Sequence, residues 1–243
     1  MPILQDAHPM LQDRFKRAAK AYSVKNPDRV LRVKQTTRTI AEQKKAFLTG
    51  RSKLDPEKKP SMHLFTPSLA IDVWIYEIDP ELRPECGYFD SKPGVPADLI
   101  LVPNGNFPAD QITSEYRKFG YEAQSWPDAY WLPGARIVWG GSWAQGNKLD
   151  RWKLPKFFDG PHIQLSNRFC VFETQRLLAN AGFDPGPLDG LWGGRTRSAL
   201  GAFCASRSKP LHLVPGRQFP LTPDTWADLW HYDDGMFKNR IEL

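Results

Sequence analysis

The chain has 243 residues, of which 41% are hydrophobic and 25% charged, and its formal net charge is +6. This composition is typical of a globular protein that can bury a sizeable core, and it excludes the low-complexity and disordered classes. The three cysteines show no CxxC spacing, which argues against a disulfide framework and a cysteine zinc site. The mild positive charge suits an anionic polymer. However, Lys and Arg do not cluster with aromatic residues, so we expect no nucleic-acid partner.

The first part of the chain predicts alternating helix and strand. Apolar residues at helical spacing predict a helix over 10–22, and β-type residues predict a strand over 29–36. Thr39 is followed three residues later by Glu42, which is the pattern of a capping box at the start of a helix. Gly50 is expected to end that helix.

The next part is dominated by loops. Residues 51–68 are polar and contain several prolines, so they predict a mobile loop. A strand that carries Asp72 follows over 70–75. Residues 77–112 show little periodicity and predict a long irregular connection, after which a helix is expected over 113–124.

Short strands are predicted again before the character of the chain changes near residue 166. Short apolar runs predict two strands, and the segment after them predicts three helices, the last with Thr222 as its N-cap. Short strands mixed with helices, without regular βαβ alternation, indicate an α+β fold with a short antiparallel sheet. We therefore expect two domains, 1–166 and 167–243, the second a three-helix domain. These later elements are the strands 137–139 and 162–165 and the helices 169–181, 195–206 and from 223 onwards.

Two imidazoles and two carboxylates lie in short segments beside the predicted strands. His63, Asp72 and His162 offer the donors that a catalytic zinc ion accepts while its fourth position holds water. Zinc lowers the pKa of that water, and Asp159 could accept its proton and pass it to a leaving amine. Arg38 could hold a substrate carbonyl or carboxylate. Taken singly, each of these residues is more often a packed or surface side chain, so the interpretation depends on their joint occurrence.

The same residues occur in a recurring order of motifs, which are Arg38 with Glu42-Gln43, Ser61-Met-His63, Ala70-Ile-Asp72, Trp139-Gly-Gly-Ser-Trp143 and Asp159-Gly-Pro-His162. This combination resembles the LAS zinc peptidases, which include the VanX and VanY D-alanyl-D-alanine peptidases and the phage or bacterial L-alanyl-D-glutamate endopeptidases. The resemblance covers roughly residues 30–165. It implies a Zn²⁺ cofactor held by His63, Asp72 and His162. It also implies Asp159 as the catalytic base, with Arg38 and Ser61 as substrate contacts.

Three features depart from the family pattern. His63 and Asp72 are nine residues apart, two more than is common, and Pro67-Ser68 stand where a glycine is usual. Ser142 follows Trp-Gly-Gly at a position where many relatives carry an acidic residue. We expect the longer spacing to alter the local wall of the substrate cleft. Trp139 and Trp143 are assigned to the core or the cleft wall rather than to catalysis.

Residues 170–205 resemble the peptidoglycan-binding module found on many wall hydrolases. The motifs that carry this resemblance are Gln175-x-x-Leu178, Gly182-Phe-Asp-Pro-Gly-Pro-Leu-Asp-Gly190, Gly193/Gly194-x-Thr196 and Ala199-x-x-x-Phe203. The resemblance implies peptidoglycan as a partner. It makes the loop with Asp189, Leu191 and Trp192 the candidate cell-wall contact. A generic helical hairpin is the structural alternative.

Together these features predict a zinc-dependent peptidoglycan endopeptidase of the endolysin type, acting as a monomer on the L-Ala-D-Glu bond of stem peptides. A D-Ala-D-Ala carboxypeptidase on the same scaffold and a non-catalytic cell-wall-binding protein are the alternatives, with a transcription factor a distant third. The N-terminus lacks a basic region followed by an apolar run, and no apolar run reaches about 18 residues. We therefore expect no classical signal peptide and no membrane insertion. Synthesis in the host cytoplasm followed by holin-type release fits these features, and so does another route of export.

Overall fold

A computed structural model describes residues 4–50, 52, 54–77, 81, 84–89, 109–125, 137–141 and 160–241. The chain divides into two compact units. The first comprises Met1–Thr37, Ser68–Pro127 and Ile137–Leu165, and the second comprises Arg38–Pro67, Asp128–Arg136 and Ser166–Leu243. The second unit therefore resumes at Ser166, where the sequence pattern changes, and it also takes in two earlier stretches of the chain. That 1–166 and 167–243 act as separate functional domains stays a prediction.

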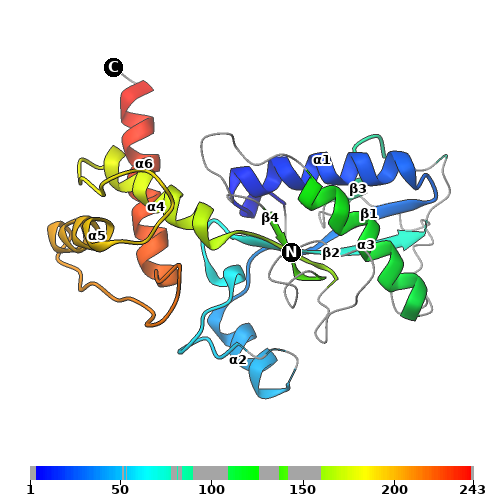
Figure 1. Cartoon of the computed structure of the whole chain (residues 1–243), viewed down its shortest axis with the longest axis horizontal. Coiled ribbons are helices and arrows are strands. Elements are labelled where there is room, and N and C mark those ends of the chain that lie inside the picture. The colour runs from blue at the N-terminus through cyan, green and yellow to red at the C-terminus, as the bar shows by residue number, and fades with distance from the viewer. Residues whose placement is uncertain are drawn as a thin grey trace. The chain divides into compact units, whose positions relative to one another are not determined.

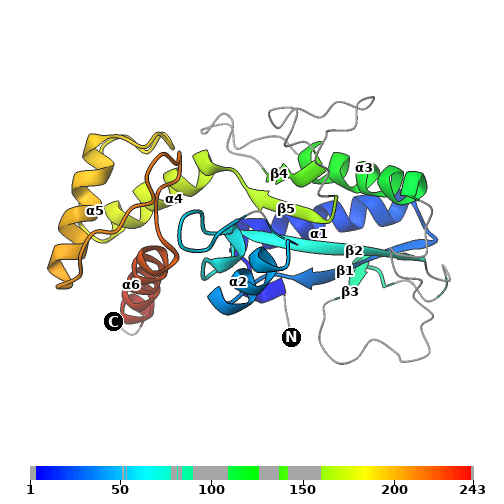
Figure 2. The ribbon, with the colours of Figure 1, turned by 90° about the horizontal axis from the view of Figure 1, so that it is seen from below.

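The first unit is built around a five-stranded sheet in the order β3-β1-β2-β5-β4 (Figures 1 and 2). The central strand β2 runs antiparallel to both β1 and β5, and β4 is antiparallel to β5. The short strand β3 joins β1 in parallel. The α+β class with a small, mainly antiparallel sheet is thereby confirmed. The strands are β1 (Arg29–Gln35), β2 (Ala70–Glu77), β3 (Tyr88–Phe89), β4 (Ile137–Trp139) and β5 (His162–Leu165).

Two long helices, α1 (Pro9–Lys25) and α3 (Ala109–Ser125), pack against each other beside this sheet (Figure 1). Their contact is aromatic, because the rings of Phe15 and Tyr22 both meet the edge or face of Phe119. It also contains a hydrogen bond of 2.6 Å from the Tyr22 hydroxyl to the Glu115 carboxylate. The first described element of this unit is a short 3-10 turn, η1 (Leu4–Asp6).

The side chains of β2 alternate between a covered face and a face that carries the polar groups. Ile71, Val73 and Ile75 are completely buried, and the Tyr116 hydroxyl of α3 donates to the Val73 carbonyl at 3.1 Å. Since successive side chains of a strand point to opposite faces, Asp72 and the other even-numbered residues of β2 lie on the face away from this core.

In its described residues, the second unit contains four helices and one short 3-10 turn. The capping box predicted at Thr39 is confirmed: its hydroxyl accepts from the Glu42 amide at 3.1 Å, and the Glu42 carboxylate accepts from the Thr39 amide at 2.8 Å. At the start of α4 the Ser166 hydroxyl accepts from the Phe169 amide at 3.2 Å. The elements are α2 (Ile40–Leu48), η2 (Met62–Leu64), α4 (Asn167–Asn180), α5 (Gly194–Ser206) and α6 (Pro223–Ile241).

A compact aromatic cluster joins the early stretch of the second unit to its C-terminal part. Phe65 lies with its ring centroid 5.4 Å from that of Phe219 and 6.4 Å from that of Trp226, and all three side chains are buried. Arg217 adds a hydrogen bond of 2.9 Å from its Nη1 to the Pro60 carbonyl oxygen. Pro60, before the 3-10 turn η2, and Phe65, directly after it, are thus held by the segment before α6 and by α6 itself.

The structure differs from the sequence-based expectations mainly in the lengths of elements. Helix α3 begins earlier than predicted, and β2 extends to Glu77. The expected loop over 51–68 contains η2, because Ser61 caps a turn there. Most of the irregular connection over 77–112 lies outside the described residues, although β3 falls within it. Within the described part of the chain, no helix is both long enough and apolar enough to cross a bilayer.

Candidate metal centre

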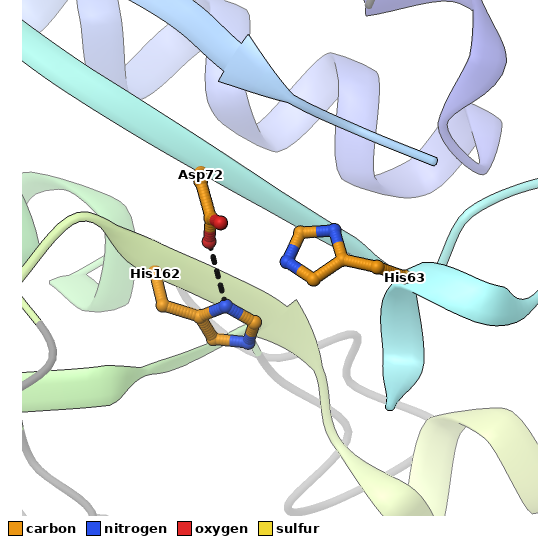
Figure 3. A group of neighbouring side chains, drawn as sticks. All are labelled: His63, Asp72 and His162. Atoms are coloured by element: carbon orange, nitrogen blue, oxygen red, sulfur yellow. Dashed lines mark hydrogen bonds and ion pairs between the residues drawn. The ribbon is translucent and has the colours of Figure 1, made fainter. Parts of the chain in front are cut away.

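Strand pairing places Asp72 directly opposite His162. The two residues are partners in the antiparallel register of β2 and β5. The His162 Nδ1 atom lies 2.8 Å from the Asp72 Oδ1 atom (Figure 3). Next to this pair, the Val73 amide donates to the Pro161 carbonyl at 2.9 Å, which continues the ladder of backbone hydrogen bonds between the two segments. A strand register is strongly specified where one face is buried, so the neighbouring core residues fix this juxtaposition.

Both ring nitrogens of His162 face oxygen atoms. Nδ1 meets the Asp72 carboxylate at 2.8 Å, and Nε2 lies 3.0 Å from the Oε1 atom of Gln164. With the Gln164 amide in this orientation, a neutral imidazole has one N–H for two acceptors. Only one of the two contacts can then be an N–H···O hydrogen bond donated by neutral His162. If Nε2 donates to Gln164, the Nδ1 lone pair is left to bind a metal ion, and Gln164 sets the ring orientation.

His63 is held in the 3-10 turn η2 by its backbone. The Ser61 hydroxyl accepts from the His63 amide at 3.4 Å, and the Arg38 amide donates to the His63 carbonyl at 2.9 Å. His63 is 2% exposed and Ser61 is 4% exposed. Two residues that the sequence assigns to substrate contact thus also shape the turn that carries a predicted metal ligand. Their contact with substrate stays a prediction.

His63, Asp72 and His162 form a group in which each residue offers one ligand atom, all within 4.8 Å of one another. Figure 3 shows the His63 ring turned toward the other two side chains. Two imidazole nitrogens and one carboxylate oxygen are the donors of a three-ligand zinc site with an open fourth position. Ligand atoms on a tetrahedral zinc lie about 3.3 Å apart, from bonds of about 2.0 Å. The group could therefore hold a metal ion after small side-chain shifts.

Arg38 belongs to a polar network in the second unit. Its Nη1 atom donates to the Gln43 Oε1 atom at 2.7 Å. Gln43 is fully buried, and its amide nitrogen donates to the Ser52 hydroxyl at 2.9 Å and to the Leu54 carbonyl at 2.7 Å. These bonds orient the guanidinium group at the start of α2. The role of Arg38 in stabilising a reacting carbonyl stays a prediction.

Trp139, which the sequence assigns to the core or the cleft wall, is buried and positions the segment that leads to His162. Its indole Nε1 donates to the Gly160 carbonyl at 2.8 Å, two residues before His162. A Cβ atom at Gly120 of α3 would lie 2.2 Å from the indole ring, and one at Gly141 would lie 2.3 Å from it. The glycines therefore make the space into which Trp139 fits. The spacing Trp139-Gly-Gly was the available sequence signal for this role.

Several predicted residues lie outside the described part of the chain. These are the proposed base Asp159, together with Ser142 and Trp143. Gly160, which follows Asp159 directly, is described and is fixed by the hydrogen bond from Trp139. Asp159 therefore stays a prediction based on its place in the sequence.

The motif residues of the C-terminal helices form an internal network around Gln175, which is 1% exposed. Its amide nitrogen donates to the Asp189 carboxylate at 3.1 Å and to the Thr196 hydroxyl at 3.3 Å, and its Oε1 accepts from the Gly190 amide at 2.9 Å. Gly190 has φ +70°, and a Cβ there would lie 2.5 Å from the Arg168 carbonyl oxygen. These motif residues therefore serve in the first place to build the turn between α4 and α5.

Of the three residues expected to contact the cell wall, Leu191 is the most exposed at 58%. Trp192 is partly exposed. The Asp189 carboxylate accepts from the Leu191 amide at 2.8 Å and from Gln175, so it is engaged in the turn. These bonds hold the pKa of Asp189 below its usual value, the backbone bond from Leu191 contributing most. Binding of glycan by this loop stays a prediction.

Comparison with known proteins identifies remote structural likeness only. No family model matches the chain, and no curated protein matches it. Among solved structures it is similar to the L-Ala D-Glu endopeptidase ChiX of Serratia marcescens, with 24% sequence identity and a TM-score of 0.35. That similarity covers 68% of this chain and 84% of the ChiX chain.

Proposed function

We propose that this chain is a zinc-dependent peptidase that hydrolyses peptidoglycan stem peptides at the L-Ala-D-Glu bond. The observation that carries the proposal is the group of His63, Asp72 and His162, with all ligand atoms within 4.8 Å. Two independent features of the chain hold these three residues in place. Asp72 and His162 meet through strand pairing, whereas His63 is supplied by a capped turn.

The donor set determines the kind of chemistry. A zinc ion bound there would polarise a substrate carbonyl and lower the pKa of a bound water to about 7. The side chains of this chain have the remaining tasks. Asp72 and His162 supply ligand atoms at a separation fixed by the sheet, and Gln164 holds the His162 ring through Nε2. Asp159 would hold the proton released from the water and deliver it to the departing amine.

Arg38 and the C-terminal helices complete the proposal. The Arg38 guanidinium, oriented by Gln43, would donate hydrogen bonds to the substrate carbonyl or carboxylate. The loop with Leu191 and Trp192 would bind the glycan and keep the enzyme on its insoluble substrate, which raises the local concentration of scissile bonds. We place the enzyme's action at the cell wall after holin-type release, as a monomer of the endolysin type.

The direct test combines metal analysis with digestion of purified cell walls. We expect one zinc ion per chain and a loss of turbidity that stops when a chelator is added and returns with zinc. Mass spectrometry of the products should show new peptides that begin with D-Glu. Release of free D-alanine would instead support a carboxypeptidase. Binding to walls without any product would support a non-catalytic wall-binding protein.

Two histidine variants sharpen this test. His162→Ala removes a ligand atom and is expected to abolish both stoichiometric zinc binding and wall hydrolysis. His212→Ala is the matched control, because His212 is exposed and lies in the loop between α5 and α6. Hydrolysis by His162→Ala at the rate of the parent protein would overturn the proposed function.

A further inference from the structure

Two cationic side chains of β1 lie on the same face of the sheet as Asp72. Arg32 is the register partner of Trp74 in β2, so the two share a face. Trp74 lies two residues from Asp72 along β2, which places its position about 7 Å away on that face. Within the described ranges, neither Arg32 nor Lys34 pairs with a carboxylate. Positive charge next to a predicted metal site is therefore not neutralised by those parts of the chain.

A β-bulge brings Lys34 into this group. Val33 pairs with Val73, but the next pair along is Gln35 with Asp72, so Lys34 is the extra residue of β1. A bulge of this kind re-aims side chains and is often found next to functional sites. Here it sets the Lys34 ammonium nitrogen 3.9 Å from the centre of the Trp74 ring. The bulge thus places the Lys34 ammonium group over the ring of Trp74, which is two residues from Asp72 along β2.

The group has one partly buried cation, Arg32, and one exposed cation, Lys34. Burial raises the pKa of Tyr76, and the nearby Arg32 guanidinium partly offsets this; the Tyr76 ring lies 6.2 Å from the Trp74 ring. Lys34 is exposed, and Trp74 is partly exposed. An anion that approaches Asp72 along β2 therefore meets an aromatic surface with an exposed ammonium group over it and a guanidinium group beside it.

We propose that Lys34, Trp74 and Arg32 form a substrate subsite that binds the free carboxylate of an acidic peptide beside the scissile bond. This inference rests on the proposed function and names its substrate class more narrowly. A carboxylate gains charge-assisted hydrogen bonds from the two cations, whereas its amide counterpart does not. The peptide backbone next to it can lie against the Trp74 ring. The subsite selects acidic peptides and disfavours amidated ones.

The experiment compares two peptides that differ in one group. One is a short stem peptide with a free glutamate carboxylate, and the other carries the corresponding carboxamide. We expect the parent enzyme to prefer the acidic peptide by about 3- to 10-fold in kcat/KM, since a hydrogen bond to a charged group is strong but the site is partly solvated. Lys34→Met should reduce this preference toward unity, and Lys34→Arg should largely keep it.

A matched control lies on α1. Lys20→Met removes an exposed lysine from that helix and should leave the preference unchanged. Equal turnover of both peptides by the parent enzyme would overturn the subsite while leaving the proposed function intact. An equal loss on both peptides in Lys34→Met would overturn it as well, because the preference for the acidic peptide would then persist without the Lys34 ammonium group.

Binding without turnover separates the subsite from the proposed hydrolysis. Isothermal titration of the zinc-free protein with the acidic peptide should give a dissociation constant about 3- to 10-fold lower than with the amidated one. Lys34→Met should lose that difference. If the parent binds both peptides equally, the subsite is wrong. If it shows the difference but cleaves neither peptide, the proposed peptidase activity fails and the anion subsite stands.

Discussion

Replacement of Phe65 by leucine tests whether the C-terminal segment holds the turn that carries His63. Phe65 is buried and touches Phe219 and Trp226 at centroid distances of 5.4 Å and 6.4 Å. Each aromatic pair contributes about 0.5–1.5 kcal/mol beyond its buried area, so the variant should lose about 1–3 kcal/mol of unfolding free energy. That is a large fraction of the usual total of about 5–15 kcal/mol, but it leaves the chain folded.

The loss should also appear in zinc affinity, because Phe65 lies two residues after His63. Residues that orient metal ligands typically change metal affinity by about 10- to 100-fold, and we expect about tenfold for this conservative replacement. Urea unfolding followed by circular dichroism measures the stability. Titration of the folded protein with zinc in the presence of a competing chelator measures the affinity.

The matched control is Phe47→Leu in α2. Phe47 is 37% exposed, and its replacement should change both quantities little. If Phe65→Leu lowers stability as predicted but binds zinc as tightly as the parent protein, then His63 is positioned without help from the aromatic cluster. That result would refute the reasoning and would indicate that zinc binding does not depend on the C-terminal segment.

Three further replacements test single interactions. Thr39→Ala removes the cap of α2 and should cost about 1 kcal/mol in urea unfolding; no loss would contradict the cap. Trp139→Phe leaves the Gly160 carbonyl without its indole donor and should cost about 1–3 kcal/mol and weaken zinc binding; unchanged zinc affinity would show that this bond does not position His162. The pKa of Asp189 is depressed in the folded chain, so its contribution is present above the ordinary carboxyl pKa and lost as the pH falls through the folded value. Asp189→Asn should therefore be less stable than the parent at pH 7 and approach it as the pH falls below the depressed pKa of Asp189 in thermal unfolding; a constant difference would contradict this assignment.

Local interactions explain why much of the fold could be predicted from the sequence. The capping box of Thr39 and Glu42 is a contact between residues three apart, so its pattern carries its own geometry. The strands over 70–77 and 162–165 are short apolar runs whose character depends on few neighbours. The candidate metal ligands could be predicted because their residue types and order match a known constellation, and the structure places His63, Asp72 and His162 together.

Long-range packing explains what the sequence could not provide. Gln164 is one of many glutamines, and its contact with His162 follows from the alternation of β5 once its register is known. The bulge at Lys34 depends on how two strands pair, which no pattern within 29–36 encodes. The grouping of Phe65 with Trp226 joins positions far apart in the chain, and such a contact follows from the packed structure alone.

The predicted ligands are held in two different ways, so their positions differ in how sensitive they are to substitutions nearby. Asp72 and His162 are cross-strand partners at the centre of a sheet with a buried face, so moving either would disturb the pairing of β2 and β5. His63 depends instead on a three-residue turn, two backbone hydrogen bonds and the aromatic packing that follows it. Local opening of a protein begins where few contacts hold the backbone. We therefore expect His63 to be the ligand whose position limits metal affinity, and changes around Ser61 and Phe65 to weaken zinc binding before they disturb the sheet.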